Sequence, residues 1–202
     1  MAEREKMKRR SSVLLMVLGT VLLALALGLW LMNRQEASQA RQFAAQVMPK
    51  VVEQIRIHRE KEPMPDPYDD LTVTQIDGWG YVGYLSVPAL EMEEPVLSEL
   101  DMAGLEIAPC RYSGTRPDRA LVIGGHNYSH NFGRLSQLQV GDAVTFVDME
   151  GTRYDYRVSE VEILPPTAVE GMTETDYALT LFTCTFGGAD RIAVRCDLIH
   201  DV

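Results

Sequence analysis

Residues 178–199 read ALTLFTCTFGGADRIAVRCDLI and contain two apolar runs separated by a glycine-rich loop. The first run, Ala178–Thr183, ends directly before Cys184. The second run, Arg191–Ile199, alternates with the period of two that a β-strand gives its side chains. The two runs therefore predict adjacent strands, and a hairpin of this length can return Arg191 to the side of Cys184. On the second strand, one face carries Ile192, Val194, Cys196 and Leu198, and the other carries Arg191, Arg195 and Asp197.

Short runs rich in Val, Ile, Tyr and Phe continue this pattern back to Gly80. Turn residues separate them, and Glu150-Gly151 suits a tight turn because glycine adopts positive φ readily. Their spacing is typical of a small antiparallel barrel. Helical turns are expected at Phe132–Leu138 and Thr173–Tyr177. The sequence thus predicts a mainly β fold whose strands cover Gly80–Val87, Ala120–Gly124, Ala143–Met149, Tyr154–Leu164, Ala178–Thr183 and Arg191–Ile199.

The N-terminal part has a different character. Residues 13–32, VLLMVLGTVLLALALGLWLM, are twenty residues without a charge. At about 1.5 Å per residue, a helix of this length spans roughly 30 Å, the hydrocarbon core of a bilayer. Residues 1–12 carry five basic and two acidic side chains, so this end is expected in the cytoplasm and the rest outside. A cleavable signal peptide cut near Ala24–Ala26 is the alternative, but the apolar run continues to Met32, which favours an uncleaved anchor.

Residues 33–77 connect this anchor to the β-rich part. Phe43, Val47, Val51 and Ile55 recur every four residues, which predicts an amphipathic helix, either a stalk or a helix packed on the domain. Pro49 is expected to kink or interrupt it. The predicted organisation is a cytoplasmic tail (1–12), a transmembrane anchor (13–32), a helical stalk and linker (33–77) and a β-rich domain (78–202).

Composition narrows the class of protein. The net charge is −10 and no basic stripe is present, so nucleic acid is not an expected partner. Three cysteines in an exported chain leave at least one free thiol, and they are too few for a disulfide-stapled scaffold. A free thiol is a candidate nucleophile. Cys196 belongs to the apolar face of its strand and is expected to be inert and buried.

Three residues at predicted strand edges can work together chemically: His126, Cys184 and Arg191. A cysteine attacks as its thiolate, which a neighbouring cation stabilises. Histidine can pass a proton to a leaving amine, and arginine can stabilise an oxyanion. Each residue also has an ordinary interpretation: a core thiol, a surface-loop histidine and a solvated arginine. Arg195 competes with Arg191 because alternation places both on the same face.

The motifs around these residues resemble one family. TLFTC at 180–184 followed by RIAV at 191–194 resembles the sortase signature T-L-x-T-C then R-x-x-V. IGGHN at 123–127 is similar to the sortase segment that ends in the catalytic histidine. YVGYLSVPALEMEEPVL at 81–97 is similar to the family's opening strand. The order of the three blocks and the N-terminal anchor also fit.

The resemblance implies a closed eight-stranded sortase-type β-barrel with short helices and a cysteine transpeptidase activity. Cys184 would attack the Thr-Gly bond of an LPXTG-like sorting motif, His126 would serve as general acid and then base, and Arg191 would stabilise the oxyanion. Implied partners are surface proteins with a C-terminal sorting signal, and a peptidoglycan precursor or a pilin amine. No cofactor and no metal is expected. The location would be the bacterial cell membrane, with one span and an extracellular catalytic domain. Expected substrate-binding residues are Gly124, Phe182, Thr183 and Arg195.

Several points stay open. GHNYSHNFGRL at 125–135 looks class B-like, whereas the short segment at 164–177 argues against class B. Asp66-Pro67-Tyr68 resembles the lid of pilus-building sortases, although a linker turn is the preferred interpretation. Glu170, Glu174 and Asp176 are read as a solvated acidic loop rather than a calcium site.

Other classes of protein remain as alternatives. L,D-transpeptidases cluster His, Gly, Cys and Arg within a few residues, and NlpC/P60-type peptidases place cysteine before histidine; neither pattern occurs here. A non-catalytic membrane-anchored scaffold on a sortase fold is the non-enzyme alternative.

Overall fold

A computed structural model describes residues 2–61, 70–115, 120–128 and 131–199. The chain forms two units, Met1–Ser38 and Gln39–Val202. One long helix, α1 (Ala2–Lys61), contributes to both. In the first unit, the apolar side chains of residues 14–32 are almost all exposed. Among the described residues, α1 is the one helix long and apolar enough to cross a membrane.

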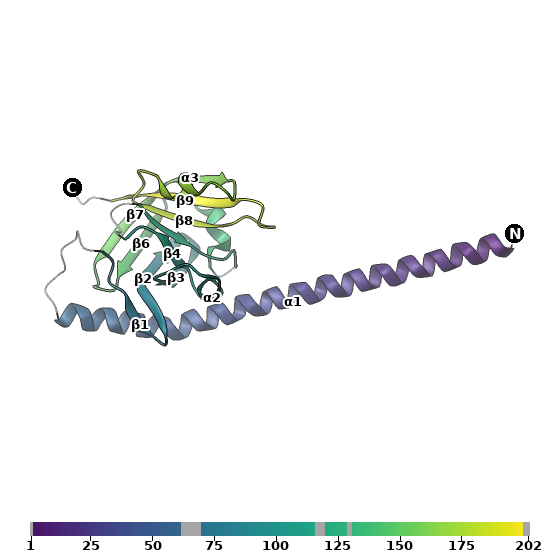
Figure 1. Cartoon of the computed structure of the whole chain (residues 1–202), viewed down its shortest axis with the longest axis horizontal. Coiled ribbons are helices and arrows are strands. Elements are labelled where there is room, and N and C mark those ends of the chain that lie inside the picture. The colour runs from purple at the N-terminus through teal and green to yellow at the C-terminus, as the bar shows by residue number, and fades with distance from the viewer. Residues whose placement is uncertain (1, 62–69, 116–119, 129–130, 200–202) are drawn as a thin grey trace. The chain divides into compact units, whose positions relative to one another are not determined.

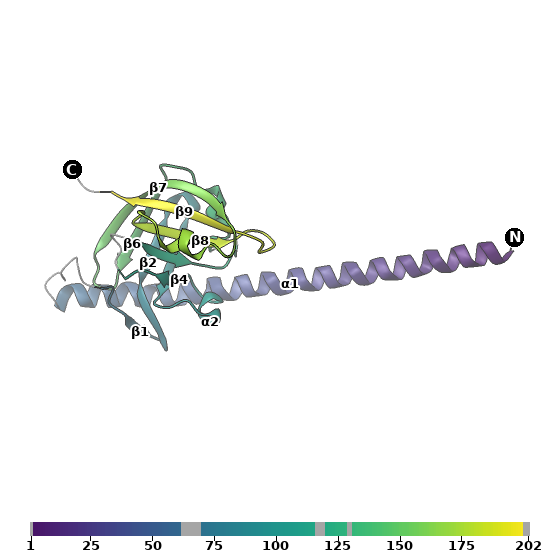
Figure 2. The same cartoon turned by 45° about the horizontal axis from the view of Figure 1, so that its top comes forward.

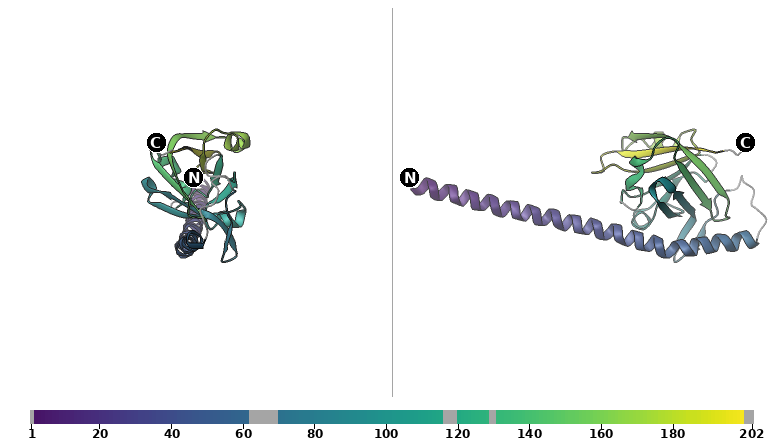
Figure 3. Two further views of the ribbon diagram at one scale, coloured as in Figure 1. Left: turned by 90° about the vertical axis from the view of Figure 1, so that its left-hand side faces the viewer. Right: turned by 180° about the vertical axis from the view of Figure 1, so that it is seen from behind.

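The second unit is built on a closed β-barrel (Figures 1 and 3). Neighbouring strands follow the order β2-β3-β4-β5-β8-β9-β7-β6, and β6 pairs with β2 to close the ring of eight. A further strand, β1, pairs with β2 outside the ring. The predicted closed eight-stranded barrel is therefore confirmed. The strands are β1 (Thr74–Ile76), β2 (Trp79–Val87), β3 (Met92–Leu97), β4 (Cys110–Ser113), β5 (Leu121–Gly124), β6 (Ala143–Asp148), β7 (Arg153–Leu164), β8 (Leu179–Cys184) and β9 (Arg191–Leu198).

Short helical segments connect the strands: η1 (Pro88–Leu90), α2 (Met102–Leu105), η2 (Phe132–Gln137) and α3 (Val169–Thr173). The turn expected at Phe132–Leu138 is confirmed as η2. The turn expected at Thr173–Tyr177 is wrong, because the helix α3 ends where that range begins. Pro165-Pro166 lies directly before the turn that leads into α3. The last turn of α3 ends with a hydrogen bond from the amide of Glu174 to the carbonyl of Glu170.

The second half of α1 packs on the barrel. Val47, Val51 and Ile55 are buried in one cluster with Tyr81 and Leu97. Their four-residue spacing places all three on one face of the helix. The predicted interruption at Pro49 is wrong, since α1 continues through it. Packing of the residues on either side holds the helix where the proline removes one backbone hydrogen bond.

Candidate active site

Cys184 and His126 lie at the same edge of the barrel because β5 and β8 are parallel neighbours. The register pairs Ile123 with Leu181 and Gly124 with Phe182. Cys184 and His126 each follow that last pair by two residues. Parallel strands end at the same edge of a sheet, so the two side chains that sequence analysis selected are brought to one place.

Arg191 joins them through the β8–β9 hairpin. The ladder pairs Cys184 directly with Arg191, and directly opposed residues in an antiparallel pair project to the same face. Gly187 and Gly188 adopt positive φ in the connecting loop. Arg191 Nη1 donates to the carbonyl oxygens of Gly188 at 3.3 Å and Asp190 at 3.1 Å. These bonds hold the guanidinium against the loop that follows Cys184.

All three residues line one cavity of about 360 Å³. Leu100, Met102 and Tyr112 also line it, as do Pro165, Pro166, Ala168, Val169 and Met172 from the segment between β7 and β8. The rest of the lining is mostly apolar, with Thr183 and Tyr112 as the other side chains that carry a polar group. A concave apolar cavity with a few convergent polar groups is the usual form of a ligand site.

The loop that carries His126 is held on both sides of Cys184. The amide of Gly125 donates to the carbonyl of Phe182 at 3.1 Å. The hydroxyl of Thr183 donates to the carbonyl of Gly125 at 2.8 Å, and Asn127 Nδ2 donates to the carbonyl of Thr185 at 3.4 Å. Sequence reasoning did not identify Asn127. Its place directly after the histidine was the available signal.

The four expected substrate-binding residues differ in their positions. Phe182 and Thr183 line the cavity, and the Phe182 ring contacts Tyr112 edge to face at 5.4 Å. Gly124 lies behind Phe182, since a Cβ there would come within 2.5 Å of the ring.

Arg195 is not brought into the cavity. Alternation predicted that Arg195 shares a strand face with Arg191, and that this face is turned toward a groove or solvent. The structure instead buries its side chain to 2% exposure, because α3 covers this part of the face.

The three cysteines differ in chemical environment. Burial, with a smaller contribution from Asp101, raises the pKa of Cys110 to about 12. Burial also raises the pKa of Cys196 to about 12. Both thiols are therefore protonated and inaccessible at neutral pH. Cys184 is the one cysteine that is not buried, which makes it the candidate nucleophile.

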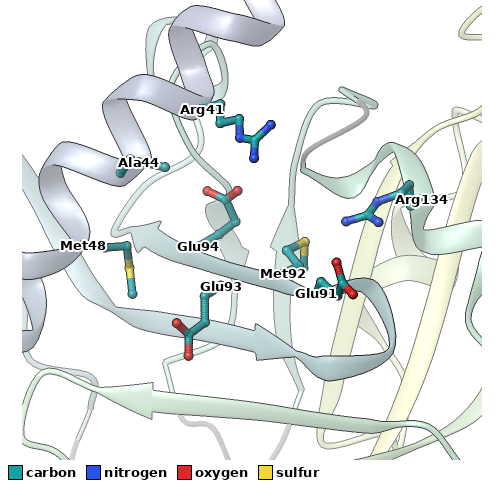
Figure 4. A pocket seen from close by; sticks show the side chains of 9 residues that line it. Arg41, Ala44, Met48, Glu91, Met92, Glu93, Glu94 and Arg134 are labelled. Atoms are coloured by element: carbon teal, nitrogen blue, oxygen red, sulfur yellow. The ribbon is translucent and has the colours of Figure 1, made fainter.

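A second cavity of about 440 Å³ lies between the packed half of α1, β3 and η2 (Figure 4). Arg41, Glu91, Glu93, Glu94 and Arg134 line it, without a cysteine or histidine. Burial raises the pKa of Glu94 to about 8, and Arg41 opposes that effect. This cavity offers no nucleophile.

Two other sequence hypotheses concern ligands and a lid. No group of three or more His, Cys, Asp or Glu side chains within the described residues could hold a metal ion. The triplet Asp66-Pro67-Tyr68 lies outside the residues that the structure describes.

Comparison with known proteins gives a family and a fold. The family model of the sortase domain matches residues 85–199. Sortase C-3 from Streptococcus pneumoniae is 23% identical, with a TM-score of 0.55 over 81% of this chain and 90% of that one. Sortase C1 from Streptococcus agalactiae is 20% identical, with a TM-score of 0.56; the match covers 85% of this chain and 99% of that one. Sortase A from Listeria monocytogenes is 22% identical, with a TM-score of 0.54; the match covers 59% of this chain and 88% of that one. The search of curated proteins finds no match.

Proposed function

Because the chain belongs to the sortase family, we propose that it cleaves an LPXTG-like sorting motif between Thr and Gly and transfers the acyl part to an amine. Sortases are cysteine transpeptidases, and the barrel found here is theirs. The observation that carries the proposal is the shared cavity in which the one accessible thiol, Cys184, lies with His126 and Arg191.

The first half-reaction forms a thioester. The Cys184 thiolate attacks the threonine carbonyl carbon and forms an S–C bond, and the carbonyl oxygen becomes an oxyanion. Arg191 stabilises this charge from its position opposite Cys184 in the ladder. The C–N bond to glycine then breaks as His126 gives its proton to the departing amine. The released peptide leaves, and the acyl group remains on sulfur.

The second half-reaction restores the enzyme. An incoming amine attacks the thioester carbon while His126 takes up the amine proton, and the S–C bond breaks to return the thiolate. The amine belongs to a peptidoglycan precursor or to a pilin lysine. The apolar walls of the cavity suit the Leu-Pro part of a sorting motif, since they leave few polar groups unpaired against it.

The N-terminal helix supports a membrane location for this reaction. Its exposed apolar segment is the expected single span, with residues 1–12 inside and the catalytic domain outside. The substrates would then be surface proteins that carry a C-terminal sorting signal.

The test is product formation by the full-length protein in detergent, with an LPXTG-type peptide library and a glycine-based amine. Mass spectrometry of the products identifies both the motif and the ligated amine. We expect ligated product from the wild type and none from Cys184→Ala, with large losses for His126→Ala and Arg191→Ala. A wild type that forms no product, and whose Cys184 also resists a small thiol reagent, would support the scaffold alternative.

A further inference from the structure

Arg195 lies beside the proposed active site without touching its cavity. We propose that it is a positioning residue for substrate recognition, whose guanidinium holds α3 in place as one wall of the Cys184 cavity. This inference deepens the proposed transpeptidase function. Its predicted effect on KM rests on that function, whereas its predicted effect on the stability of α3 does not.

The guanidinium of Arg195 ties three elements together. Nε donates to Glu162 Oε1 on β7 at 2.8 Å. Nη1 donates to Thr180 Oγ1 on β8 at 3.0 Å and to the carbonyl of Met172 at 3.3 Å. Nη2 donates to the carbonyl of Gly171 at 2.5 Å. The rigid fork of an arginine can serve these acceptors at once, whereas the single ammonium of a lysine cannot.

The helix α3 depends on such a contact because it is too short to be stable alone. It has five residues, and a single helical turn is marginal in water. Carbonyl groups in its last turn lack partners within the helix. Two of them, on Gly171 and Met172, accept from Arg195. In Figure 1, α3 lies beside β9, the strand that carries Arg195, and Figure 2 turns this part of the barrel toward the viewer.

Met172 links this clamp to the cavity. Its carbonyl accepts from Arg195, while its side chain is 5% exposed and packs with Val122 and Ala193. The same side chain lines the cavity with Cys184, together with Ala168 and Val169. A shift of α3 therefore moves the wall that would contact the substrate.

Direct contact between Arg195 and substrate does not fit the structure. Its side chain is 2% exposed and its guanidinium donates only to protein acceptors. The Tyr177 ring lies 5.9 Å from its Cζ and covers it further. Arg195 therefore acts through α3, in contrast to Arg191, which lines the cavity.

The experiment compares Arg195→Lys with the wild type in the full-length protein. Hydrogen exchange should become at least about tenfold faster in residues 169–173. With the best library peptide, KM should rise about tenfold, as expected when one charge-assisted hydrogen bond is lost, and kcat should change less than about threefold. Alkylation of Cys184 by iodoacetamide should keep its rate. Arg157→Lys is the matched control, since Arg157 is exposed and donates to the carbonyl of Gly141; it should change none of these quantities.

Each arm can overturn the proposal. Unchanged exchange in residues 169–173 would show that Arg195 does not hold α3. Loss of kcat at constant KM, or slower alkylation of Cys184, would assign Arg195 to the chemical step instead. If Arg195→Lys does not fold, Glu162→Gln weakens the same clamp and should show a smaller change in the same direction. The exchange arm needs no turnover, so failure of the proposed function is distinguishable from failure of this inference.

Discussion

The hydrogen bond from Thr183 to Gly125 should connect the stability of the His126 loop to catalysis. Thr183→Val removes the hydroxyl and nearly preserves the shape of the side chain. The lost bond is 2.8 Å long, from a side chain that is 1% exposed. Gly125 is buried as well, so its carbonyl loses a partner that water cannot readily replace.

The expected magnitude follows from that burial. Leaving a buried acceptor unsatisfied costs roughly 1–3 kcal/mol. Because Gly125 directly precedes His126, this free energy acts on the loop that positions the imidazole. A factor of ten in kcat/KM corresponds to about 1.4 kcal/mol. We therefore expect kcat/KM to fall about 5- to 150-fold in Thr183→Val.

The assay is transpeptidation of the best library peptide, alongside urea unfolding. Thr145→Val is the matched control: Thr145 is also buried, and its hydroxyl donates to Asp155 on β7 at 2.6 Å. Both variants should lose stability, but only Thr183→Val should lose activity. Equal kcat/KM for Thr183→Val and the wild type, despite a measurable stability loss, would refute the view that this bond positions His126.

Three further predictions concern packing, charge and thiol reactivity. Gly124→Ala places a Cβ within 2.5 Å of Phe182 Cζ, so overpacking should lower the free energy of unfolding by roughly 1–3 kcal/mol; an unchanged urea midpoint would contradict this. Glu94 stays protonated in the folded state up to about pH 8 but ionises near 4.5 when unfolded, so stability should fall as pH rises between these values, by at most about 1.4 kcal/mol per unit. Glu94→Gln should lose that part of the slope in urea midpoints measured from pH 5 to 8, whereas a variant with the full wild-type slope would disprove the assignment. Iodoacetamide should label one thiol per native chain, Cys184, as read by peptide mass spectrometry; modification of Cys110 or Cys196 before unfolding would contradict their burial.

The sequence was sufficient to predict the longer strands, whose apolar residues recur regularly. It missed β3, because Pro95 and the pair Glu93-Glu94 resemble a loop although Glu94 is buried. It also missed β1 and β4, which have only three and four residues. Short strands of this kind are fixed by their neighbours in the barrel rather than by their own pattern.

The candidate site was more accessible to sequence reasoning than its surroundings. Cys184 and Arg191 converge through a hairpin that is local in the sequence. His126 joins them through the long-range parallel pairing of β5 with β8, and the motif around it was the signal that identified it. Arg195 shows the limit of the approach. Alternation gives the face of a strand on which a side chain lies, but it does not reveal that α3 covers that face.

The most direct test of the central claim is peptide-level mass spectrometry of the full-length protein, quenched in acid during turnover of an LPXTG-type peptide. The account predicts a thioester adduct, with the mass of the peptide acylated through threonine, on the tryptic fragment that contains Cys184. It also predicts that added amine removes the adduct and yields the ligated product. Product formation with no adduct on Cys184, or an adduct on another residue, would contradict it.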